Sequence, residues 1–353
     1  MRISEILTPK AIAAQYTEVA ANRIPYLGAG LFPNAKKMGL DLALIKAHKG
    51  LNVKLAPANF DAKATLRARG NLSVERSEMA FFREAMLVSE HDQQEIMRVQ
   101  EAGDPYAMDI LRRIYDDANT LIDAANMVPE IMRMQLLCPT TGSPKINVAG
   151  RDGVVYSYNY DPNGEYQQNN FVQVTIGWNN SATAAPLDDI RAAQDQIEGT
   201  QGTRPSVAIM NRTTFGKFAA TQQVRNAILA QNVTANIYMA DAIVKNVLRD
   251  TLGITVLLYD KVYANENGTT EKFYKDDFVT LLPAGAVGKT WYGTTPEERG
   301  GKNVAIVNTG VAVSVIDYEN PVNTETVVSE IVLPSYERMA ETCVIKVSAA
   351  QGS

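Results

Sequence analysis

The stretch from Pro283 to Thr290 contains the residue types of a phosphate-binding loop. It reads PAGAVGKT, and in such a loop the glycine-rich backbone holds phosphates, the lysine reaches the outer phosphates and the last hydroxyl binds magnesium. Pro283, however, occupies the place of the first glycine. The residues after Lys289 read TWYGTTPEE, which cannot continue as the helix whose N-terminus would face the anion. We therefore expect a turn between strands.

The other residues that commonly do chemistry are few and scattered. His48 and His91 lie far apart and belong to no HExxH spacing, so they support neither a zinc site nor a histidine-based triad. Cys138 and Cys343 are the only cysteines, and we expect both to be buried, reduced thiols. We predict no catalytic residue, no cofactor-binding residue and no metal ligand in this chain.

Paired carboxylates are a further candidate for acid–base work. Adjacent residues on a helix do not face one another, and no histidine or lysine accompanies the pairs in a pattern. A solvated surface or a helix N-terminus explains them better. The pairs are Asp188 with Asp189, Asp276 with Asp277, and Glu297 with Glu298.

Composition places the chain among ordinary folded proteins. Apolar residues make up 46% of the 353 residues and charged residues 21%, which indicates neither disorder nor a fibrous protein. The net charge is -5 and no long basic run occurs, so direct binding to nucleic acid is disfavoured. No signal peptide and no long apolar run is visible, and synthesis in the cytoplasm is the expectation.

Residues 1–50 read as an arm. Their short apolar clusters are separated by prolines and glycines, too interrupted to build a core. The arm could lie across its own domain or across a neighbouring subunit, and the sequence leaves both open. The side chains expected to anchor it are Ile12, Tyr16, Tyr26 and Phe32.

Residues 51–88 read as a long β-hairpin with Arg69, Gly70 and Asn71 at its turn. A bare two-stranded hairpin is marginal in water unless it packs on another surface. We expect that surface on another chain, with folding back onto its own domain as the alternative. The candidate intersubunit residues are Lys63, Arg67, Arg69, Glu75, Arg76 and Glu78.

Two helices and a β-rich region follow. Residues 89–101 favour a helix, and Gly103, Asp104 and Pro105 supply the break, cap and first-turn proline of a second one. Apolar residues at three- and four-residue steps extend this helix over 104–137. Such a helix would be roughly 50 Å long, more than a small globule needs, and so serves as a spine. The short strand-like runs that follow carry the turn DPNGEYQQNN.

An α/β domain begins at Pro186. It opens with a helix over 187–197 and the buried strand SVAIMN, and continues with helices, the strand ITVLLYD and a hairpin turning at Asn-Gly. The last forty residues are almost wholly strand-like and should return to the first β-rich region.

This order of elements is unusual, and it resembles the Hong Kong 97-type capsid fold of tailed phages. The segments PLDDIRAAQDQIEGTQGTRPSVAIMN, LLPAGAVGKTWYGTTPEE and PVNTETVVSEIVLPSYERMAE are similar to the lambda-type major capsid protein family, phage capsid protein E. The resemblance covers nearly the whole chain. It implies an α+β fold with an N-arm, an extended hairpin called the E-loop, a peripheral domain with the spine helix, and an α/β axial domain.

The resemblance also implies domain limits. They are residues 1–50 for the N-arm, 51–88 for the E-loop, 89–185 for the peripheral domain with its spine helix at 104–137, 186–318 for the axial domain, and 319–353 for the returning strands of the peripheral domain.

The implied function is that of a self-assembling structural protein. Copies of the chain would form hexamers and pentamers of an icosahedral shell around double-stranded DNA, without sequence-specific binding to that DNA. A separate scaffolding protein, a portal protein and a decoration protein would be partners, and a membrane would not. The shell would assemble in the host cytoplasm and end in the virion.

Two alternatives to this function differ in class. An encapsulin-like nanocompartment shell shares the fold and encloses cargo enzymes. A nucleotide-binding enzyme built on PAGAVGKT would instead bind nucleotide and lose that binding in a Lys289→Ala variant.

Overall fold

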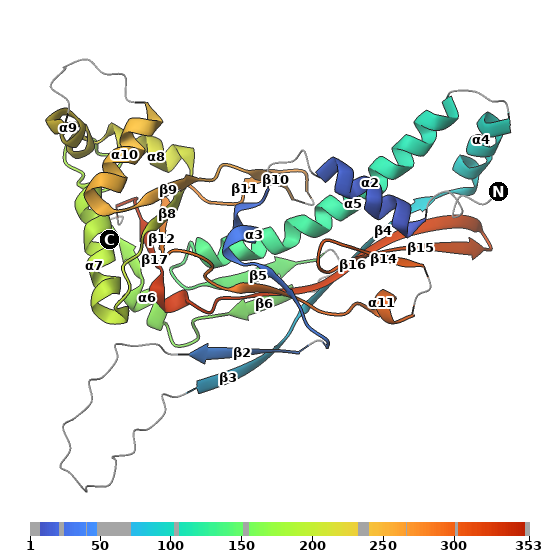
Figure 1. Cartoon of the computed structure of the whole chain (residues 1–353), viewed down its shortest axis with the longest axis horizontal. Helices are drawn as coiled ribbons and strands as arrows, with labels where there is room; N and C mark the ends of the chain where they lie inside the picture. Colours follow the sequence, from blue (N-terminus) through green and yellow to red (C-terminus); the bar gives the residue numbers. More distant parts are fainter. Residues whose placement is uncertain are drawn as a thin grey trace, which may run out of the picture. The chain divides into compact units, whose positions relative to one another are not determined.

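The computed structural model describes residues 8–20, 25–39, 41–47, 72–101, 106–150, 155–231, 240–265, 267–300 and 303–349 (Figure 1). The chain divides into two compact units. Unit 1 comprises Met1–Ala43, Arg76–Met132 and Lys289–Ser335, and unit 2 comprises Leu44–Glu75, Arg133–Gly288 and Tyr336–Ser353.

The elements of unit 1 come from three separate stretches of the chain. Its helices are α2 (Pro9–Ala20), α3 (Leu27–Leu31), α4 (Glu90–Glu101), most of α5 (Tyr106–Leu137) and α11 (Pro296–Gly300). Its strands are β1 (Asn34–Lys36), β4 (Ala80–Val88), β13 (Lys289–Tyr292), β14 (Val304–Val307), β15 (Val311–Glu319) and β16 (Val322–Ser335).

One six-stranded sheet organises unit 1. Its order is β1-β13-β16-β15-β14, and β4 also pairs with β16. All neighbours are antiparallel except β1, which lies parallel to β13. The long strand β16 is its centre, since β4 lies along one edge while β15 and β13 pair with successive parts of β16.

The core of unit 1 lies between one face of this sheet and the helices α2 and α5. Alternate residues of β15, such as Val311, Val313 and Val315, point to the helices, as the two-residue period of a strand requires. The remaining members of this cluster are Ile12, Tyr16, Val88, Ala118, Leu121, Ile122, Val307 and Val328.

Unit 2 contains an α/β core. Its helices are α6 (Glu165–Asn169), α7 (Pro186–Gln201), α8 (Arg212–Ala220), α9 (Gln222–Gln231) and α10 (Asp241–Leu252), with the short 3-10 helix η1 (Met339–Glu341). Its strands are β5 (Lys145–Ala149), β6 (Val155–Asn159), β7 (Phe171–Gln173), β8 (Val207–Met210), β9 (Thr255–Leu258), β10 (Val262–Ala264), β11 (Thr270–Lys272), β12 (Phe278–Leu282) and β17 (Cys343–Lys346).

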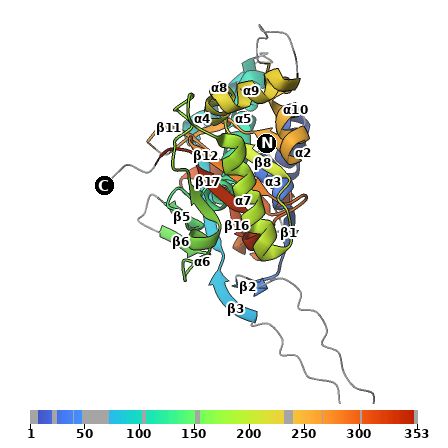
Figure 2. The ribbon, with the colours of Figure 1, turned by 90° about the vertical axis from the view of Figure 1, so that its left-hand side faces the viewer.

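The main sheet of unit 2 has the order β7-β17-β12-β8-β9. Helices α7 to α10 cover one of its faces, and Figure 2 views this unit with α7 in front of the sheet strands. Trp178 and Phe218 are fully buried in that layer, with their ring centroids 5.5 Å apart. β5 with β6, and β10 with β11, form separate two-stranded sheets.

Hydroxyl groups add a hydrogen-bonded layer inside unit 2. The Tyr274 hydroxyl donates to the carbonyl of Ile209 at 3.1 Å and shares a 2.8 Å hydrogen bond with Thr280. Tyr166 and Tyr336 both hydrogen-bond to the hydroxyl of Thr342. Burial raises the pKa of all three tyrosines, so they stay neutral and hold their bonds.

Several expected elements agree with the structure. The spine helix expected over 104–137 is α5, described from Tyr106 to Leu137. The helix expected over 187–197 is α7, and the strand SVAIMN and the hairpin turning at Asn-Gly are present as β8 and β10–β11.

Other elements differ from the expectation. Residues 9–20 form the helix α2 and not an irregular arm. The expected turn DPNGEYQQNN contains the helix α6, because the Asp161 carboxylate accepts hydrogen bonds from the backbone N–H groups of Tyr166 and Gln167 at 3.0 Å each.

Strands from different expected domains pair in one sheet, while the expected domain limits stay a prediction. Strands β13, β14 and β15 fall within the expected axial domain 186–318, yet they pair in the sheet of unit 1. The last strand, β17, pairs with β7 and β12 in unit 2. Pairing between strands that are distant in sequence places β13 to β15 in unit 1 and β17 in unit 2. Composition along the chain does not predict such pairing.

Candidate functional site

The segment Pro283–Thr290 is a turn between two strands, as expected. It leaves β12 at Leu282 and enters β13 at Lys289, so no helix begins after the lysine. The Lys289 ammonium lies 5.6 Å from the centre of the Trp291 ring, and the Thr290 hydroxyl donates to the carbonyl of Phe32 at 3.0 Å. The two groups that would bind phosphate and magnesium are therefore engaged in packing β13.

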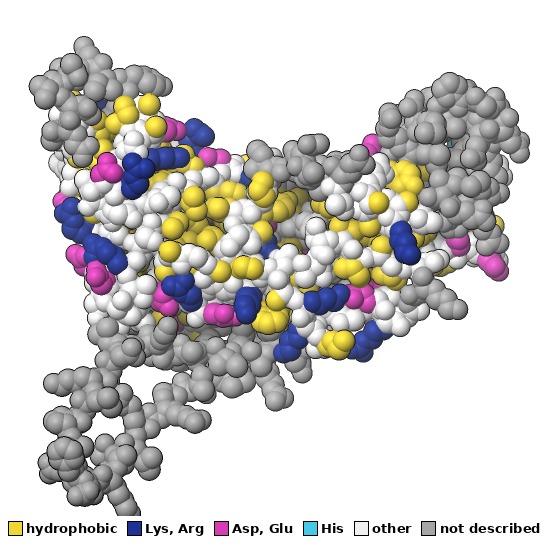
Figure 3. All heavy atoms as spheres, in the orientation of Figure 1, with side chains coloured by type: hydrophobic (Ala, Val, Ile, Leu, Met, Phe, Trp, Pro, Cys, Tyr) yellow, Lys and Arg dark blue, Asp and Glu magenta, His cyan; other side chains and the backbone are white. Residues whose placement is uncertain are grey.

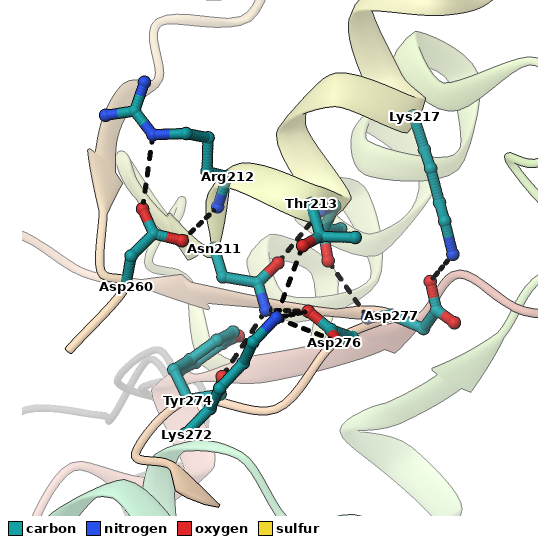
Figure 4. Close-up of polar contacts among 10 residues, drawn as sticks. Asn211, Arg212, Thr213, Lys217, Asp260, Lys272, Tyr274, Asp276 and Asp277 are labelled. Carbon is teal, nitrogen blue, oxygen red and sulfur yellow. Dashed lines mark hydrogen bonds and ion pairs between the residues drawn. The ribbon is translucent and has the colours of Figure 1, made fainter. Parts of the chain in front are cut away.

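A polar cluster of unit 2 lies where β8 meets α8 (Figure 4). Asn211 caps α8 by accepting a hydrogen bond from the backbone N–H of Thr214 at 2.9 Å, and its amide donates to the Asp276 carboxylate. The Lys272 ammonium contacts both oxygens of Asp276, at 2.8 and 3.0 Å. This arrangement ties the segment after β11 to the start of α8.

Two further ion pairs flank this cluster. The backbone N–H of Arg212 donates to Asp260 at 2.7 Å, and the Arg212 side chain lies 3.7 Å from the same carboxylate. Lys217 forms an ion pair with Asp277, whose backbone has the left-handed φ of 66°. These two ion pairs anchor the loop after β9 and the loop before β12 to helix α8.

The electrostatics of this polar cluster indicate a structural role. Partial burial raises the pKa of the Asp276 carboxyl, but the hydrogen bonds from Lys272 and Asn211 outweigh it, and the net pKa is lowered. Asp276 is therefore an ionised acceptor at neutral pH and not a proton donor. Lys272 and Asn211 satisfy the hydrogen-bonding capacity of the Asp276 carboxylate, so it needs no substrate as a partner.

The cysteines and histidines of the described residues do not form a reactive site. Burial raises the pKa of Cys138 and of Cys343 to about 12, which keeps both thiols protonated. His91 is exposed on α4, and His48 lies outside the described residues. Among the described residues, no group of three or more metal-ligating side chains gathers in one place.

The predicted N-arm residues lie in or beside the core of their own unit. Ile12 and Phe32 are fully buried, and the buried Tyr16 donates its hydroxyl to Asp123 at 3.0 Å. Tyr26 is half-buried and precedes α3. For residues 8–20 and 25–39 this arrangement favours the alternative of an arm across its own domain.

Sequence reasoning missed the groups that hold this arm. Asn126 on α5 donates to the Tyr16 hydroxyl at 3.0 Å and accepts from Asn308 at 2.8 Å. The Glu130 carboxylate, fully buried, accepts from the backbone N–H of Gly28 at 3.0 Å. A polar residue on the apolar face of a long helix is the signal that could have found them.

The predicted E-loop residues are only partly described. Lys63, Arg67 and Arg69 lie outside the described residues, and Glu75 and Arg76 are placed only as members of β3 (Leu72–Glu78). Glu78 ends that strand and is exposed. β3 pairs with β2 (Asp41–Ala47), so one strand of this hairpin region begins earlier than the expected residue 51.

The surface carries no continuous basic area in the described residues that Figure 3 shows. Lys and Arg side chains lie singly or in small groups, interspersed with acidic ones. None of the helices described is both long enough and apolar enough to span a bilayer.

The fold is shared with solved phage structures. A phage-related protein from Bordetella bronchiseptica RB50 has 12% identity and a TM-score of 0.56, with 98% of this chain and 99% of that chain covered. A prophage protein of E. coli CFT073, assigned as its capsid protein, has 14% identity and a TM-score of 0.58, with 97% and 99% covered. The capsid asymmetric unit of cyanophage A-1(L) has 10% identity and a TM-score of 0.50, with 92% and 93% covered.

These neighbours define the class as the Hong Kong 97-type capsid fold. A comparison with curated proteins finds no match. The model of the family described as "Phage major capsid protein E" matches residues 10–347, so the chain belongs to that family. Its function is that of a major capsid protein of a bacteriophage, and the family match supports a phage shell over a nanocompartment.

Proposed function

We propose that copies of this chain assemble into hexamers and pentamers of an icosahedral shell that encloses double-stranded DNA. The family match over residues 10–347 is the observation that supports the proposal. The separate scaffolding, portal and decoration proteins are proposed on the same ground, as is assembly in the host cytoplasm. We propose no sequence-specific contact with DNA, in keeping with a net charge of -5.

Electron microscopy of the purified protein, alone and with a co-expressed scaffolding protein, tests this proposal. Closed shells with both six-fold and five-fold capsomers are expected. A chain that remains monomeric under all assembly conditions contradicts it.

We further propose that residues 51–88 contact an adjacent subunit through Lys63, Arg67, Arg69, Glu75, Arg76 and Glu78. The support is physical, because the hairpin sequence is polar at its far end and a two-stranded hairpin needs a surface to pack on. Paired charge reversal, Arg67→Glu with Arg69→Glu, should lower the yield of shells while leaving the thermal unfolding of the free subunit unchanged. Normal shell yield would remove this role.

The shell role is proposed to be the whole function, without catalysis. The support is that Lys289 and Thr290 are engaged in strand packing and that both cysteines are buried. The purified protein should bind no labelled nucleotide. Binding that disappears in Lys289→Ala would instead restore the enzymatic alternative.

A further inference from the structure

Two asparagine–glycine pairs lie in exposed turns of unit 2. Asn163 precedes Gly164 in the turn that opens α6, and Asn267 precedes Gly268 in the hairpin of β10 and β11 (Figure 1). Both glycines have a left-handed backbone, with φ of 71° and 74°. A Cβ added to either glycine would meet nothing within 4 Å, so the space around both is open.

An asparagine followed by glycine has a chemistry of its own. The glycine nitrogen, after losing its proton to solvent, attacks the side-chain carbonyl carbon of the asparagine. The nitrogen–Cγ bond forms, the Cγ–Nδ2 bond breaks and ammonia leaves, which closes a five-membered succinimide. Water then opens this ring at one of its two carbonyl carbons and leaves aspartate or isoaspartate. Glycine favours the attack because no side chain shields its nitrogen.

The turn at Asn267 is closed by several hydrogen bonds. The Gly268 N–H donates to the carbonyl of Asn265 at 2.9 Å. The side-chain oxygen of Asn265 accepts from the backbone N–H groups of Asn267 and Thr269, at 3.1 and 3.0 Å. The reacting nitrogen of this pair is therefore held in a turn that is fixed on both sides.

The turn at Asn163 is held less tightly. The Gly164 N–H donates to the carbonyl of Asp161 at 3.2 Å. Within the part of the chain that the structure describes, Asn163 itself makes no hydrogen bond, and its side chain is exposed. Freeing the nitrogen of Gly164 thus breaks fewer hydrogen bonds than freeing that of Gly268.

We propose that Asn163 is a site of spontaneous deamidation in the folded chain, which reacts through the backbone nitrogen of Gly164 to give isoaspartate or aspartate. The net reaction takes up one water, releases ammonia and exchanges an amide for a carboxylate. It needs no other reactant and occurs in the free subunit, so it does not depend on the proposed function.

Asp161 connects this site to α6. Its carboxylate accepts from the backbone N–H groups of Tyr166 and Gln167 at 3.0 Å each, and from the Ser143 hydroxyl at 3.3 Å. Isoaspartate at position 163 lengthens the backbone by one atom between this acceptor and α6. It also adds a second carboxylate to the same turn, and like charges repel. The hydrogen bonds that begin α6 should weaken.

The end of α6 is in turn bonded to the last strand of unit 2. Asn170 follows α6, and its side-chain amide donates to the carbonyls of Ala340 and Thr342 at 2.9 and 2.6 Å. Its backbone carbonyl accepts from the N–H of Val344 in β17 at 2.8 Å. Tyr166 shares a 3.2 Å hydrogen bond with the Thr342 hydroxyl. Isoaspartate at position 163 should therefore lower the stability of unit 2.

Peptide mass spectrometry of the aged free subunit tests the site. The full chain is kept at mildly alkaline pH in heavy-oxygen water, so that conversion during the incubation carries the label, and is then digested. Conversion at Asn163 should be about tenfold faster than at Asn267, a ratio equivalent to about 1.4 kcal/mol. In concentrated urea the two rates should become similar, because both turns are lost and glycine follows both asparagines.

Two results overturn the proposal. One is the absence of conversion at Asn163 in the folded chain, or conversion at Asn267 that is as fast. The other is a ratio that is the same in urea as in buffer, since the folded turns would then not determine the rates.

Urea unfolding before and after the incubation tests the connection to α6. Asn163→Gln keeps an exposed amide but would need a six-membered ring to react, so it should match wild type when fresh and stay unchanged when aged. Aged wild type should unfold at lower urea concentration, and Asn267→Gln, the matched control, should age as wild type does. Asn163→Asp adds the carboxylate without lengthening the backbone and should unfold close to fresh wild type. If aged wild type that contains isoaspartate unfolds as Asn163→Gln does, the connection to α6 is wrong.

Discussion

The two main sheets of this protein differ in how completely they are covered. In unit 2 every residue of β12 is buried, and β8 and β17 are buried over most of their length. In unit 1 the residues of β4 from Arg83 to Leu87 and those of β15 from Asp317 to Glu319 are exposed. The main sheet of unit 2 is covered within its own unit, whereas the sheet of unit 1 has strands that remain exposed.

The difference follows from the sequence of the strands. β12 reads FVTLL, a continuous apolar run typical of a strand buried on both faces. β4 reads AFFREAMLV, where charged residues interrupt the apolar ones in the middle of the strand. We expect the covered sheet to hold the fold before assembly and the exposed sheet to be available for contacts with neighbouring copies.

The largest effect should come from the core between the main sheet of unit 2 and the helices that cover it. Phe218→Ala removes a fully buried ring that packs against Trp178 and Phe215. We expect a loss of about 3 to 5 kcal/mol in the free energy of unfolding of the free subunit, measured in urea. Leu87→Ala on β4 is the control from the open sheet, where about 0.5 kcal/mol or less is expected.

Equal losses for Phe218→Ala and Leu87→Ala would remove the contrast between the sheets. The contrast also predicts opposite results after assembly. Leu87→Ala should change shell yield more than it changes subunit stability, because its exposed side chain lies on the face left open.

A smaller effect is expected for the arm. Ile12 is fully buried against α5 and the sheet of unit 1, so Ile12→Ala should lower the free energy of unfolding by about 2 to 4 kcal/mol. An arm that packs only on a neighbour would give no change in the free subunit. Urea unfolding of Ile12→Ala before assembly separates the two, and Thr17→Ala on the exposed side of α2 is its control.

The polar anchor of the arm should contribute less. Tyr16→Phe keeps the buried ring and removes the hydroxyl that bonds to Asp123 and Asn126. A loss of about 1 kcal/mol in the free energy of unfolding is expected. The Tyr16→Phe and Asn126→Ala variants should be non-additive, since they remove one shared hydrogen bond; strict additivity contradicts the contact.

Local patterns in the sequence were enough for the long elements. The spacing of apolar residues in α5 and the proline that opens α7 fix those helices, because both signals act within one helix. The phosphate-loop alternative also failed on local grounds, since Pro283 and the residues after Thr290 are incompatible with it. The fold class followed from the order of such elements together with the resemblance to known capsid proteins.

Contacts between distant residues could not be predicted in this way. The sequence of β17 does not show that it pairs with β12 and β7, and that of β16 does not show that it pairs with β4. The arm was read as lacking a core because its apolar clusters are short, yet Ile12 and Tyr16 complete a core built by α5 and β15.

The smallest effect is expected for the polar cluster around Asp276 in unit 2. The pKa of Asp276 is lowered from its usual value of 3.8, so its ionised form is favoured in the folded state. A lowered carboxyl pKa stabilises the fold above the unfolded pKa, and this contribution is lost as the pH falls through the folded pKa. Asp276→Asn should therefore reduce stability at neutral pH, and the difference from wild type should shrink as the pH falls below 3.8 and through the lower folded pKa.

The size of this difference should be under about 1 kcal/mol, because Asp276 and Lys272 are both partly exposed and water screens the pair. Urea unfolding of wild type and Asp276→Asn across the pH range measures it. Introducing Asp276→Asn into a Lys272→Gln background should have a smaller effect, since the ion pair is already lost there. A difference that grows as the pH falls would have the opposite sign, and would show that Asp276 is protonated in the folded protein.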